Sequence, residues 1–314
     1  MARRQRRKGF VPHQGLSTAL AKRFTPYRSA RAAVSIVLAG VLACACSTPS
    51  EPTETPEPAA SSAPLPYSGY PDSIAALGHS FMTGEGTQPG GDESAWKANS
   101  WATGTNPEIN SVYLRLVHVN PAIEGHANNL ATGGADLTEL TEQGHALVQL
   151  QPQPELVVIA TIDNDIACPA SNDDFGIYGS RLSNLLTTLS EQMPASRFYI
   201  TTQGSTPKHD AEIYSRAERA SFGGTGPCAF LDPKGNVVPK EMKRLETAIA
   251  GYEAQVTAVC TAAVRCSTDQ TGRGWSTKRS DLSDDLNHLN VAGQARWAKH
   301  EWSLLEAAHL VPAG

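Results

Sequence analysis

A serine near the start of the chain's predicted folded part has the surroundings of a candidate nucleophile. In AALGHSFMTGEG (75–86), four small apolar residues are typical of the end of a buried strand, and Gly78 permits a sharp turn two residues before Ser80. A serine hydroxyl is a weak nucleophile that needs a neighbouring base. Because Gly-x-Ser is also common in ordinary turns, the assignment depends on the rest of the chain.

An aspartate and a histidine near the C-terminus supply a candidate base. In SDDLNHLNVAGQARWA, Asp285 and His288 are three residues apart, just before a predicted helix. At that spacing in a turn, the carboxylate can reach a ring nitrogen, fix the imidazole tautomer and stabilise its charged form. The alternative is a surface or helix-capping role for His288, since Asn287 and Asn290 also suit the start of a helix.

Two further segments offer hydrogen-bond donors for a developing negative charge. In NNLATGGADL, Gly133 and Gly134 follow a predicted strand, and in ATIDNDIACP, Asn164 lies just past another. The backbone N–H groups of Ser80 and Gly134 and the side-chain amide of Asn164 would give three donors to an oxyanion. Each such donor typically contributes about 3 kcal/mol in a dry site. The candidate residues together supply what acyl transfer requires.

Alternating strands and helices are predicted to position these residues. The apolar patterns predict strands at 73–78, 126–131, 154–162, 197–203 and 263–268, and helices at 112–119, 135–150, 179–193, 239–260 and 290–308. This alternation implies a parallel sheet with helices on both faces. Function gathers at the carboxyl ends of the strands in such sheets, which is where Ser80 and Asn164 would lie. The segments 86–108 and 204–238 are expected to be loops that shape the acyl and alcohol pockets.

The four segments resemble, in order, the four sequence blocks of the SGNH hydrolases, also called GDSL esterases and lipases. The resemblance covers roughly residues 71–310, with GHSFMTGEG, NNLATGGA, DNDI and DLNH as the matching blocks. It implies a flavodoxin-like, three-layer α/β/α fold with a central, mainly parallel five-stranded sheet. It also implies carboxylic ester hydrolysis through an acyl-enzyme, without a cofactor or metal. The residues it assigns are the catalytic Ser80, His288 and Asp285 and an oxyanion hole of Ser80, Gly134 and Asn164.

Two departures from the family pattern bear on activity. His79 stands where the family usually has an aspartate, and Ile162 and Asp163 stand where it usually has two glycines. The resemblance therefore predicts a differently braced nucleophile and a differently shaped backbone before Asn164. Two alternative functions follow: an SGNH-fold binding module with weak or no turnover, and an acyltransferase that uses the same residues on envelope sugars.

The first 46 residues are expected to be an export leader. Residues 1–45 contain nine Lys and Arg and no acidic residue, and AAVSIVLAGVLACAC (32–46) is an apolar run too short to span a bilayer comfortably. The end of the run, VLAC (41–44), resembles a bacterial lipoprotein cleavage box. Cys44 is then the residue to be lipidated, and Cys46 is the alternative. A plain secretory signal, a twin-arginine signal and an uncleaved anchor are the alternatives. The following residues 47–69, rich in Pro, Ser and Glu, are expected to form a disordered tether before a hydrolase domain at 70–314.

The remaining four cysteines are expected to form two disulfides, as an even number in an exported chain suggests. Three pairings exist in principle; Cys260 and Cys266 are natural partners because they are six residues apart, which leaves Cys168 for Cys228. Zinc is the alternative, but the chain has no CxxC and no close Cys/His clustering. Calcium held by the carboxyl-type side chains of 163–165 is a further alternative.

The charge balance excludes one class of partner. Without the nine leader cations, 17 Lys and Arg face 31 Asp and Glu, a net charge of −14. Such an acidic body does not suit phosphate binding, so no nucleic-acid partner is expected. We expect a monomer that acts on a small-molecule or envelope ester. Its place would be the outer face of the bacterial cytoplasmic membrane, held only by an N-terminal lipid anchor or leader, or the medium outside.

Overall fold

The computed structural model describes residues 69–224, 227–270, 272 and 274–313. The predicted leader with Cys44 and Cys46, and the predicted tether except for Gly69, lie outside the described residues. Within the described part, no helix is long and apolar enough to cross a bilayer.

A five-stranded parallel sheet forms the centre of the described part. Its strands are β1 (Ile74–Leu77), β2 (Ala127–Asn129), β3 (Leu156–Ala160), β4 (Arg197–Thr201) and β5 (Cys266–Thr268). They pair in the order β2-β1-β3-β4-β5, every pair parallel. This is the flavodoxin-like order, so the predicted fold class is confirmed.

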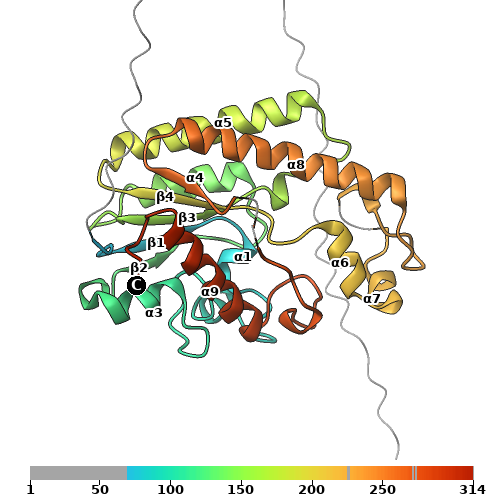
Figure 1. Ribbon diagram of the computed structural model, residues 1–314, viewed down its shortest axis with the longest axis horizontal. Helices are drawn as coiled ribbons and strands as arrows, with labels where there is room; N and C mark the ends of the chain where they lie inside the picture. Colours follow the sequence, from blue (N-terminus) through green and yellow to red (C-terminus); the bar gives the residue numbers. More distant parts are fainter. Residues whose placement is uncertain (1–68, 225–226, 271, 273, 314) are drawn as a thin grey trace, which may run out of the picture. The chain divides into compact units, whose positions relative to one another are not determined.

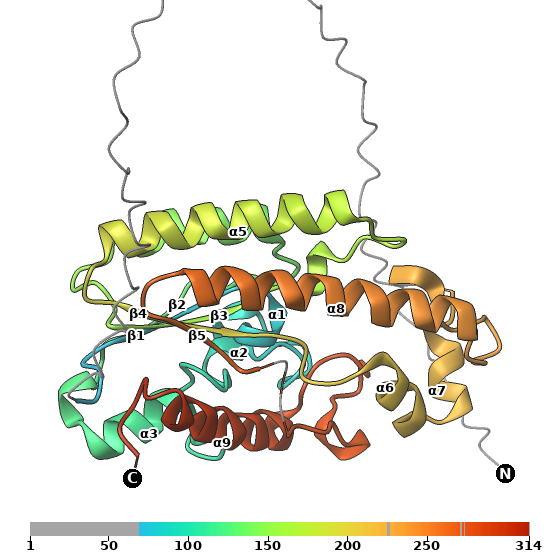
Figure 2. The same cartoon turned by 45° about the horizontal axis from the view of Figure 1, so that its top comes forward.

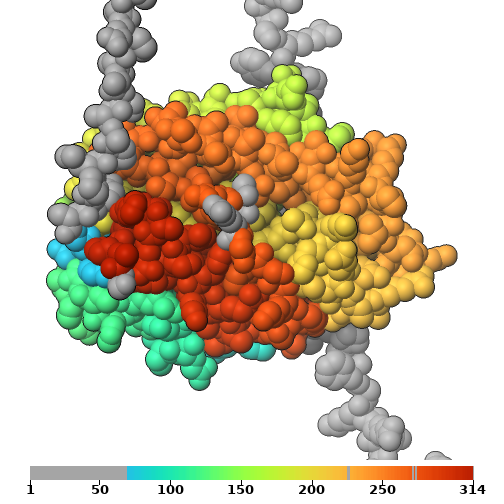
Figure 3. All heavy atoms as spheres, in the orientation of Figure 1, coloured from blue at the N-terminus to red at the C-terminus, as the bar shows by residue number. Residues whose placement is uncertain are grey.

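Helices cover both faces of this sheet (Figures 1 and 2). The described residues form α1 (Ser80–Thr83), α2 (Glu93–Lys97), α3 (Val112–Val119), α4 (Leu137–Leu147), α5 (Asn172–Gln192), α6 (Pro207–Ile213), α7 (Arg216–Ser221), α8 (Pro239–Ala262) and α9 (Val291–Ala307). Short 3-10 segments are η1 (Pro121–Ile123), η2 (Asp163–Asp165), η3 (Pro227–Ala229) and η4 (Arg279–Asp281). Figure 2 shows α5 and α8 on one side of the sheet and α3 and α9 on the other. Figure 3 shows a face to which α8, α9 and the α6–α7 region all contribute.

Strand residues alternate between two hydrophobic cores. Ile74 and Val158 pack with α3, α9 and the buried Trp101, whereas Ala75 and Val157 pack with α4, α5 and α8. All five residues of β3 are buried, as the continuous apolar run predicts for a central parallel strand. The two cores hold the carboxyl ends of β1, β3 and β4 at one edge of the sheet, where the candidate residues lie.

Two expected loops contain short helices. The segment 86–108 includes α2 and the fully buried Trp101, and the segment 204–238 includes α6, α7 and η3. Each of the three short helices begins with a side-chain cap, for example Asp92, which accepts from the Ala95 N–H at 3.0 Å. Such caps stabilise helices too short to show an apolar period.

Candidate active site

The loop that carries Ser80 is held by a glycine and a buried glutamine. Gly78 has φ +127°, and a Cβ on it would lie 2.2 Å from the carbonyl oxygen of Ala160, so only glycine fits against β3. The Gly78 N–H donates to Oε1 of Gln143 at 2.6 Å, and Nε2 of Gln143 donates to the Gly78 carbonyl at 3.0 Å. The half-buried Ser80 then begins α1. The sequence does not predict this role of Gln143. The one hint is that a polar residue stands among the apolar, buried positions of α4.

His79 caps the helix that begins at Ser80. The side chain is 5% exposed, and its Nδ1 accepts from the Phe81 N–H at 3.4 Å. Burial lowers the pKa of His79; Asp163, whose Oδ2 lies 4.0 Å from Nδ1, raises it, and His288 lowers it further. Burial therefore favours the neutral imidazole at His79. In this chain the histidine supplies an N-cap at the position where the family usually has an aspartate.

Asp285 and His288 form a hydrogen-bonded pair within one turn. His288 Nδ1 lies 2.8 Å from Asp285 Oδ2. The other carboxylate oxygen, Oδ1, accepts from Ser283 Oγ at 2.6 Å and from the N–H groups of Asn287 and His288 at 2.8 and 2.9 Å. One carboxylate therefore shapes the turn with one oxygen and orients the imidazole with the other.

These contacts shift both pKa values. Burial alone would raise the pKa of Asp285, but its hydrogen bonds from His288, Ser283 and Asn287 outweigh burial and hold it below the ordinary value. Burial lowers the pKa of His288, but Asp285 outweighs it, with smaller contributions from Glu85 and Asp163, and the net shift is upward. The pair thus combines an ionised carboxylate with an imidazole of increased basicity.

The turn packs directly on the segment that follows α1. Gly86 has φ +83°, and a Cβ there would lie 2.8 Å from His288 Cβ and 2.7 Å from Ser283 Oγ. The two segments, some 200 residues apart in the sequence, are therefore in contact. Among the described residues, His288 Nε2 lies near Asn287 Nδ2 at 3.3 Å, and no hydrogen bond joins it to Ser80 Oγ. The structure forms the predicted Asp285–His288 pair of the candidate triad.

Two of the three predicted oxyanion donors, Gly134 and Asn164, lie in neighbouring segments. Gly134 follows β2 with φ +76°, and the space where a Cβ would stand is empty to 4 Å. Asn164 lies in η2 after β3, and its Nδ2 donates to the carbonyl of Ala135 at 3.0 Å. This bond fixes the amide beside the Gly134 peptide and leaves the second N–H of Nδ2 for a ligand.

The backbone before Asn164 has a conformation that usually requires glycine. Ile162 is fully buried with φ +90° and ψ −56°. Such a conformation costs a β-branched residue on the order of 1–3 kcal/mol. The loss of glycine in this block therefore does not remove the positive φ; apolar packing around Ile162 imposes it instead.

The acidic side chains of η2 contact different groups. Asp163 Oδ1 accepts from Gln203 Nε2 at 3.2 Å, whereas Asp165 Oδ1 accepts from the N–H of Leu137, the first residue of α4, at 3.0 Å. Burial raises the pKa of Asp165 to about 6. The described residues contain no cluster of side chains arranged to hold a metal ion. The calcium alternative has no geometric support in them.

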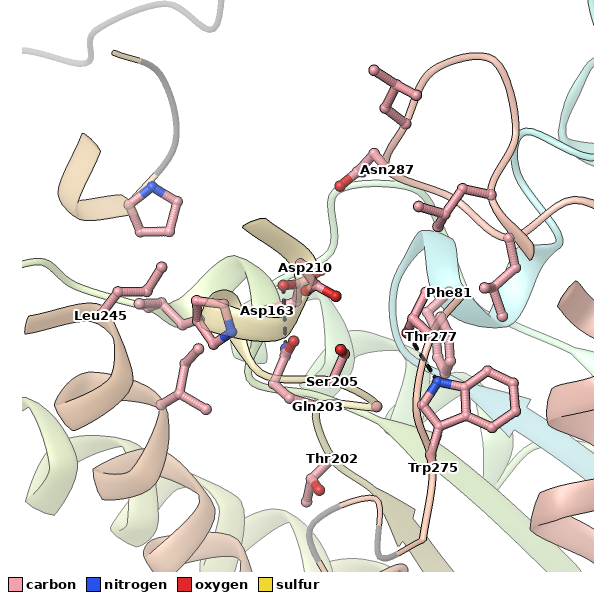
Figure 4. A pocket seen from close by; sticks show the side chains of 18 of the residues that line it. Phe81, Asp163, Thr202, Gln203, Ser205, Asp210, Leu245, Trp275, Thr277 and Asn287 are labelled. Carbon is pink, nitrogen blue, oxygen red and sulfur yellow. Dashed lines mark hydrogen bonds between the residues drawn. The ribbon is translucent and has the colours of Figure 1, made fainter. Parts of the chain in front are cut away.

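A cavity of about 440 Å³ adjoins the candidate catalytic residues. It borders His79 and Phe81, the two neighbours of Ser80, and also Asp285. The α6–α8 region supplies much of its wall, so segment 204–238 shapes a pocket as expected, whereas segment 86–108 does not line this cavity. Figure 4 shows Asp163, Gln203, Ser205 and Asp210 grouped between Leu245 on one side and Phe81 and Trp275 on the other.

Both predicted disulfides are present. Cys168 pairs with Cys228 across a Cα–Cα distance of 5.1 Å, and Cys260 pairs with Cys266 across 5.2 Å. The first connects the segment after η2 to η3 beside the cavity, and the second connects the end of α8 to β5. The zinc alternative is thereby excluded for these four cysteines.

Similar proteins are found among solved structures. TesA is 14% identical, with 75% of this chain and 98% of that chain covered and a TM-score of 0.45. The esterase EstA from Pseudoalteromonas sp. is 12% identical (75% and 97% covered, TM-score 0.44), and an extracellular lipase from Streptomyces rimosus is 14% identical (74% and 98% covered, TM-score 0.42). No protein-family model matches the chain, and no curated protein matches it. At these identities, function has to be argued from the side chains themselves.

Proposed function

We propose that the chain is a serine esterase of the SGNH type that cleaves carboxylic esters through an acyl-enzyme. The observation that carries this proposal is the Asp285–His288 pair, joined at 2.8 Å and packed against Gly86, six residues after Ser80. A base oriented by a carboxylate and placed beside a serine is the arrangement that activates a hydroxyl. The raised pKa of His288 suits it to accept that proton.

In the proposed reaction, Ser80 Oγ attacks the ester carbonyl while its proton passes to Nε2 of His288. The carbonyl oxygen becomes an oxyanion that accepts from the N–H groups of Ser80 and Gly134 and from Asn164 Nδ2. The intermediate collapses, and the leaving alcohol takes the proton from Nε2. Water then attacks the acyl-enzyme by the same route and releases the acid, which restores Ser80.

The test is hydrolysis of p-nitrophenyl acetate by the wild-type chain and two serine variants. Ser80→Ala should lower kcat by at least about 10³-fold, because the remaining groups cannot replace the nucleophile. Ser94→Ala, at an exposed serine on α2, is the matched control and should leave kcat unchanged. Activity of Ser80→Ala at the wild-type level would exclude this function.

A binding module is the second candidate. The observation in its favour is the position of Asn287 Nδ2, 3.3 Å from the nitrogen of His288 that Ser80 would need. A fluorophosphonate probe separates the two, because it labels only an activated serine. Labelling of Ser80 supports the esterase; a folded chain that never labels there supports the binding module. An acyltransferase uses the same residues and is recognised by acylated sugar products when a sugar acceptor is supplied.

We also propose that the chain works outside the cytoplasm, attached through Cys44 or Cys46. The two disulfides support this, because such bonds persist in oxidising compartments. Mass spectrometry of the N-terminal peptide from membrane fractions tests it. A lipid-modified cysteine at the N-terminus is the expected result, and an unmodified full-length chain in the cytoplasm would contradict it.

A further inference from the structure

The cavity beside Ser80 identifies a substrate class if the proposed function holds. We propose that it binds an uncharged, hydroxyl-bearing group, so that the substrate is an O-acylated sugar or similar polyol rather than an anionic ester or an ester of a long hydrocarbon chain.

The cavity lies beside the proposed nucleophile. His79 and Phe81 flank Ser80 in the chain, and both line the cavity together with Asp285, the partner of the proposed base. A group that fills this space can therefore belong to the same ester whose carbonyl Ser80 attacks. At about 440 Å³ the cavity is far larger than an acetyl group and lies within the size range of small-molecule sites.

The charged side chains among the described residues that line the cavity are all carboxylates. Asp163, Asp210 and Asp285 line the cavity, and no Lys or Arg is among the described residues that line it. On the side of the oxyanion glycines, Glu85 Oε2 lies 2.8 Å from the point where a Cβ on Gly133 would stand, and its charge raises the pKa of His288. An anionic substrate would meet repulsion from both directions, only partly screened by salt.

The inner part of the cavity offers hydrogen bonds that a hydrocarbon chain cannot use. Gln203 donates to Asp163 at 3.2 Å, and Figure 4 shows both beside Ser205 and Asp210. Burial raises the pKa of Asp210, Asp163 adds to the effect, and the neighbouring Ser205 and His209 side chains oppose it. Carboxyl, amide and hydroxyl groups in a half-enclosed space lose water when a ligand enters, so the ligand must supply hydrogen bonds in return.

Apolar side chains complete the walls on either side of these polar groups. Phe81 and Trp275 lie on one side and Leu245 on the other (Figure 4). A sugar ring has apolar C–H faces and a rim of hydroxyl groups, so it can pack against the walls while its hydroxyls bind the carboxylates and the amide. Neither a plain alkyl chain nor a phosphate group satisfies both requirements.

The first experiment compares two pairs of substrates with the wild-type chain at pH 8. The first pair is methyl 2-O-acetyl-glucopyranoside and the same ester with a carboxylate at C6, and the second pair is p-nitrophenyl octanoate and p-nitrophenyl acetate. We expect kcat/KM for the neutral sugar ester to exceed that of the anionic one at least tenfold at 20 mM salt. The ratio should shrink in 0.5 M NaCl, and the octanoate should react no faster than the acetate.

The second experiment changes one carboxylate of the cavity. Asp210→Asn removes a charge that repels the anionic ester. It should therefore reduce the ratio of kcat/KM between the neutral and the anionic sugar ester at least threefold, mainly by lowering KM for the anionic ester. Asp173→Asn, at an exposed position in the first turn of α5, is the matched control and should leave the ratio unchanged. Thermal melting by circular dichroism checks that both variants fold. If either variant does not fold, the comparison of substrates with the wild-type chain still tests the inference.

The outcomes separate this inference from the proposed function. A wild-type chain that fails to hydrolyse p-nitrophenyl acetate refutes the esterase itself. If hydrolysis occurs and depends on Ser80, equal rates on the two sugar esters, or a preference for the octanoate, overturn the sugar-ester inference alone. The same conclusion follows if Asp210→Asn and Asp173→Asn change the ratio equally.

Discussion

Replacing Asp285 by asparagine would reverse the hydrogen bond that orients the base. Oδ1 of Asp285 accepts from three donors, Ser283 Oγ and the N–H groups of Asn287 and His288, so the amide oxygen of the asparagine must take that position. The NH₂ group then faces His288 Nδ1, where Oδ2 now lies at 2.8 Å. Nδ1 would have to accept, so the proton would move to Nε2, the nitrogen that Ser80 needs as a base.

The expected loss follows from this wrong tautomer. In Ser–His–Asp triads the change lowers kcat about 10⁴-fold. At about 1.4 kcal/mol for each tenfold change, this corresponds to roughly 5.5 kcal/mol of transition-state stabilisation. Folding stability should change little, because the asparagine oxygen keeps the three bonds that shape the turn.

The pH profile provides a second readout. His288 acts as a base only when neutral, so kcat/KM rises with pH through its pKa. Burial lowers that pKa and Asp285 more than restores it. Asp285→Asn removes the carboxylate and leaves the burial, so the pKa of His288 should fall. The acid limb of the kcat/KM profile should therefore move to lower pH, and the plateau value of kcat/KM should decrease.

The assay is p-nitrophenyl acetate hydrolysis from pH 5 to 9, with Asp284→Asn as the matched control at an adjacent exposed position. The control should keep the wild-type rate and profile. An Asp285→Asn variant within tenfold of the wild-type kcat, or with its acid limb at higher pH, would refute the assignment of Asp285 as the orienting residue.

Three further predictions concern the oxyanion hole, a buried carboxyl group and a disulfide. Asn164→Ala should lower kcat for p-nitrophenyl acetate about 10²–10³-fold with little change in Tm, because it removes one of three expected donors. Glu301 is fully buried and its pKa is raised well above the ordinary value, chiefly by burial. The folded state therefore holds a proton that the unfolded state releases above about pH 4.5, and stability falls as pH rises from there. Glu301→Gln should accordingly raise the urea midpoint at pH 8 and not at pH 4. Cys228→Ser should reduce esterase activity at temperatures below the melting transition seen by circular dichroism, since it frees η3 from Cys168 beside the cavity.

The periodic parts of the fold could be predicted because burial determines them locally. The five predicted strand segments contain β1 to β5, and the predicted helices at 112–119, 239–260 and 290–308 correspond to α3, α8 and α9 within two residues. The helix predicted at 179–193 begins seven residues earlier. Gly179 obscures its pattern; a Cβ there would lie 2.3 Å from Gln255 Oε1, so this glycine stands where α5 meets α8.

The residue types of the candidate site could be predicted from the sequence. The residues that hold them in position could not. Ser80, His288 and Asn164 stand in short segments whose composition indicates chemistry. Gln143 holds the turn at Gly78 from 65 residues further along the chain, through a contact that depends on how helix and sheet pack. Long-range packing of this kind leaves no spacing signal, so the sequence does not predict this role of Gln143.

The turn of residues 283–288 has a consequence for how the site tolerates motion. Asp285 and His288 belong to one hydrogen-bonded turn that also leads into α9, so a displacement of that helix moves acid and base together as a rigid unit. The distance and orientation between the Asp285 carboxylate and the His288 ring then stay nearly constant. Thermal fluctuation or a distant core substitution acts mainly on one coordinate, the separation between this unit and Ser80. The site should accordingly lose activity gradually, by widening, rather than abruptly, by disassembly.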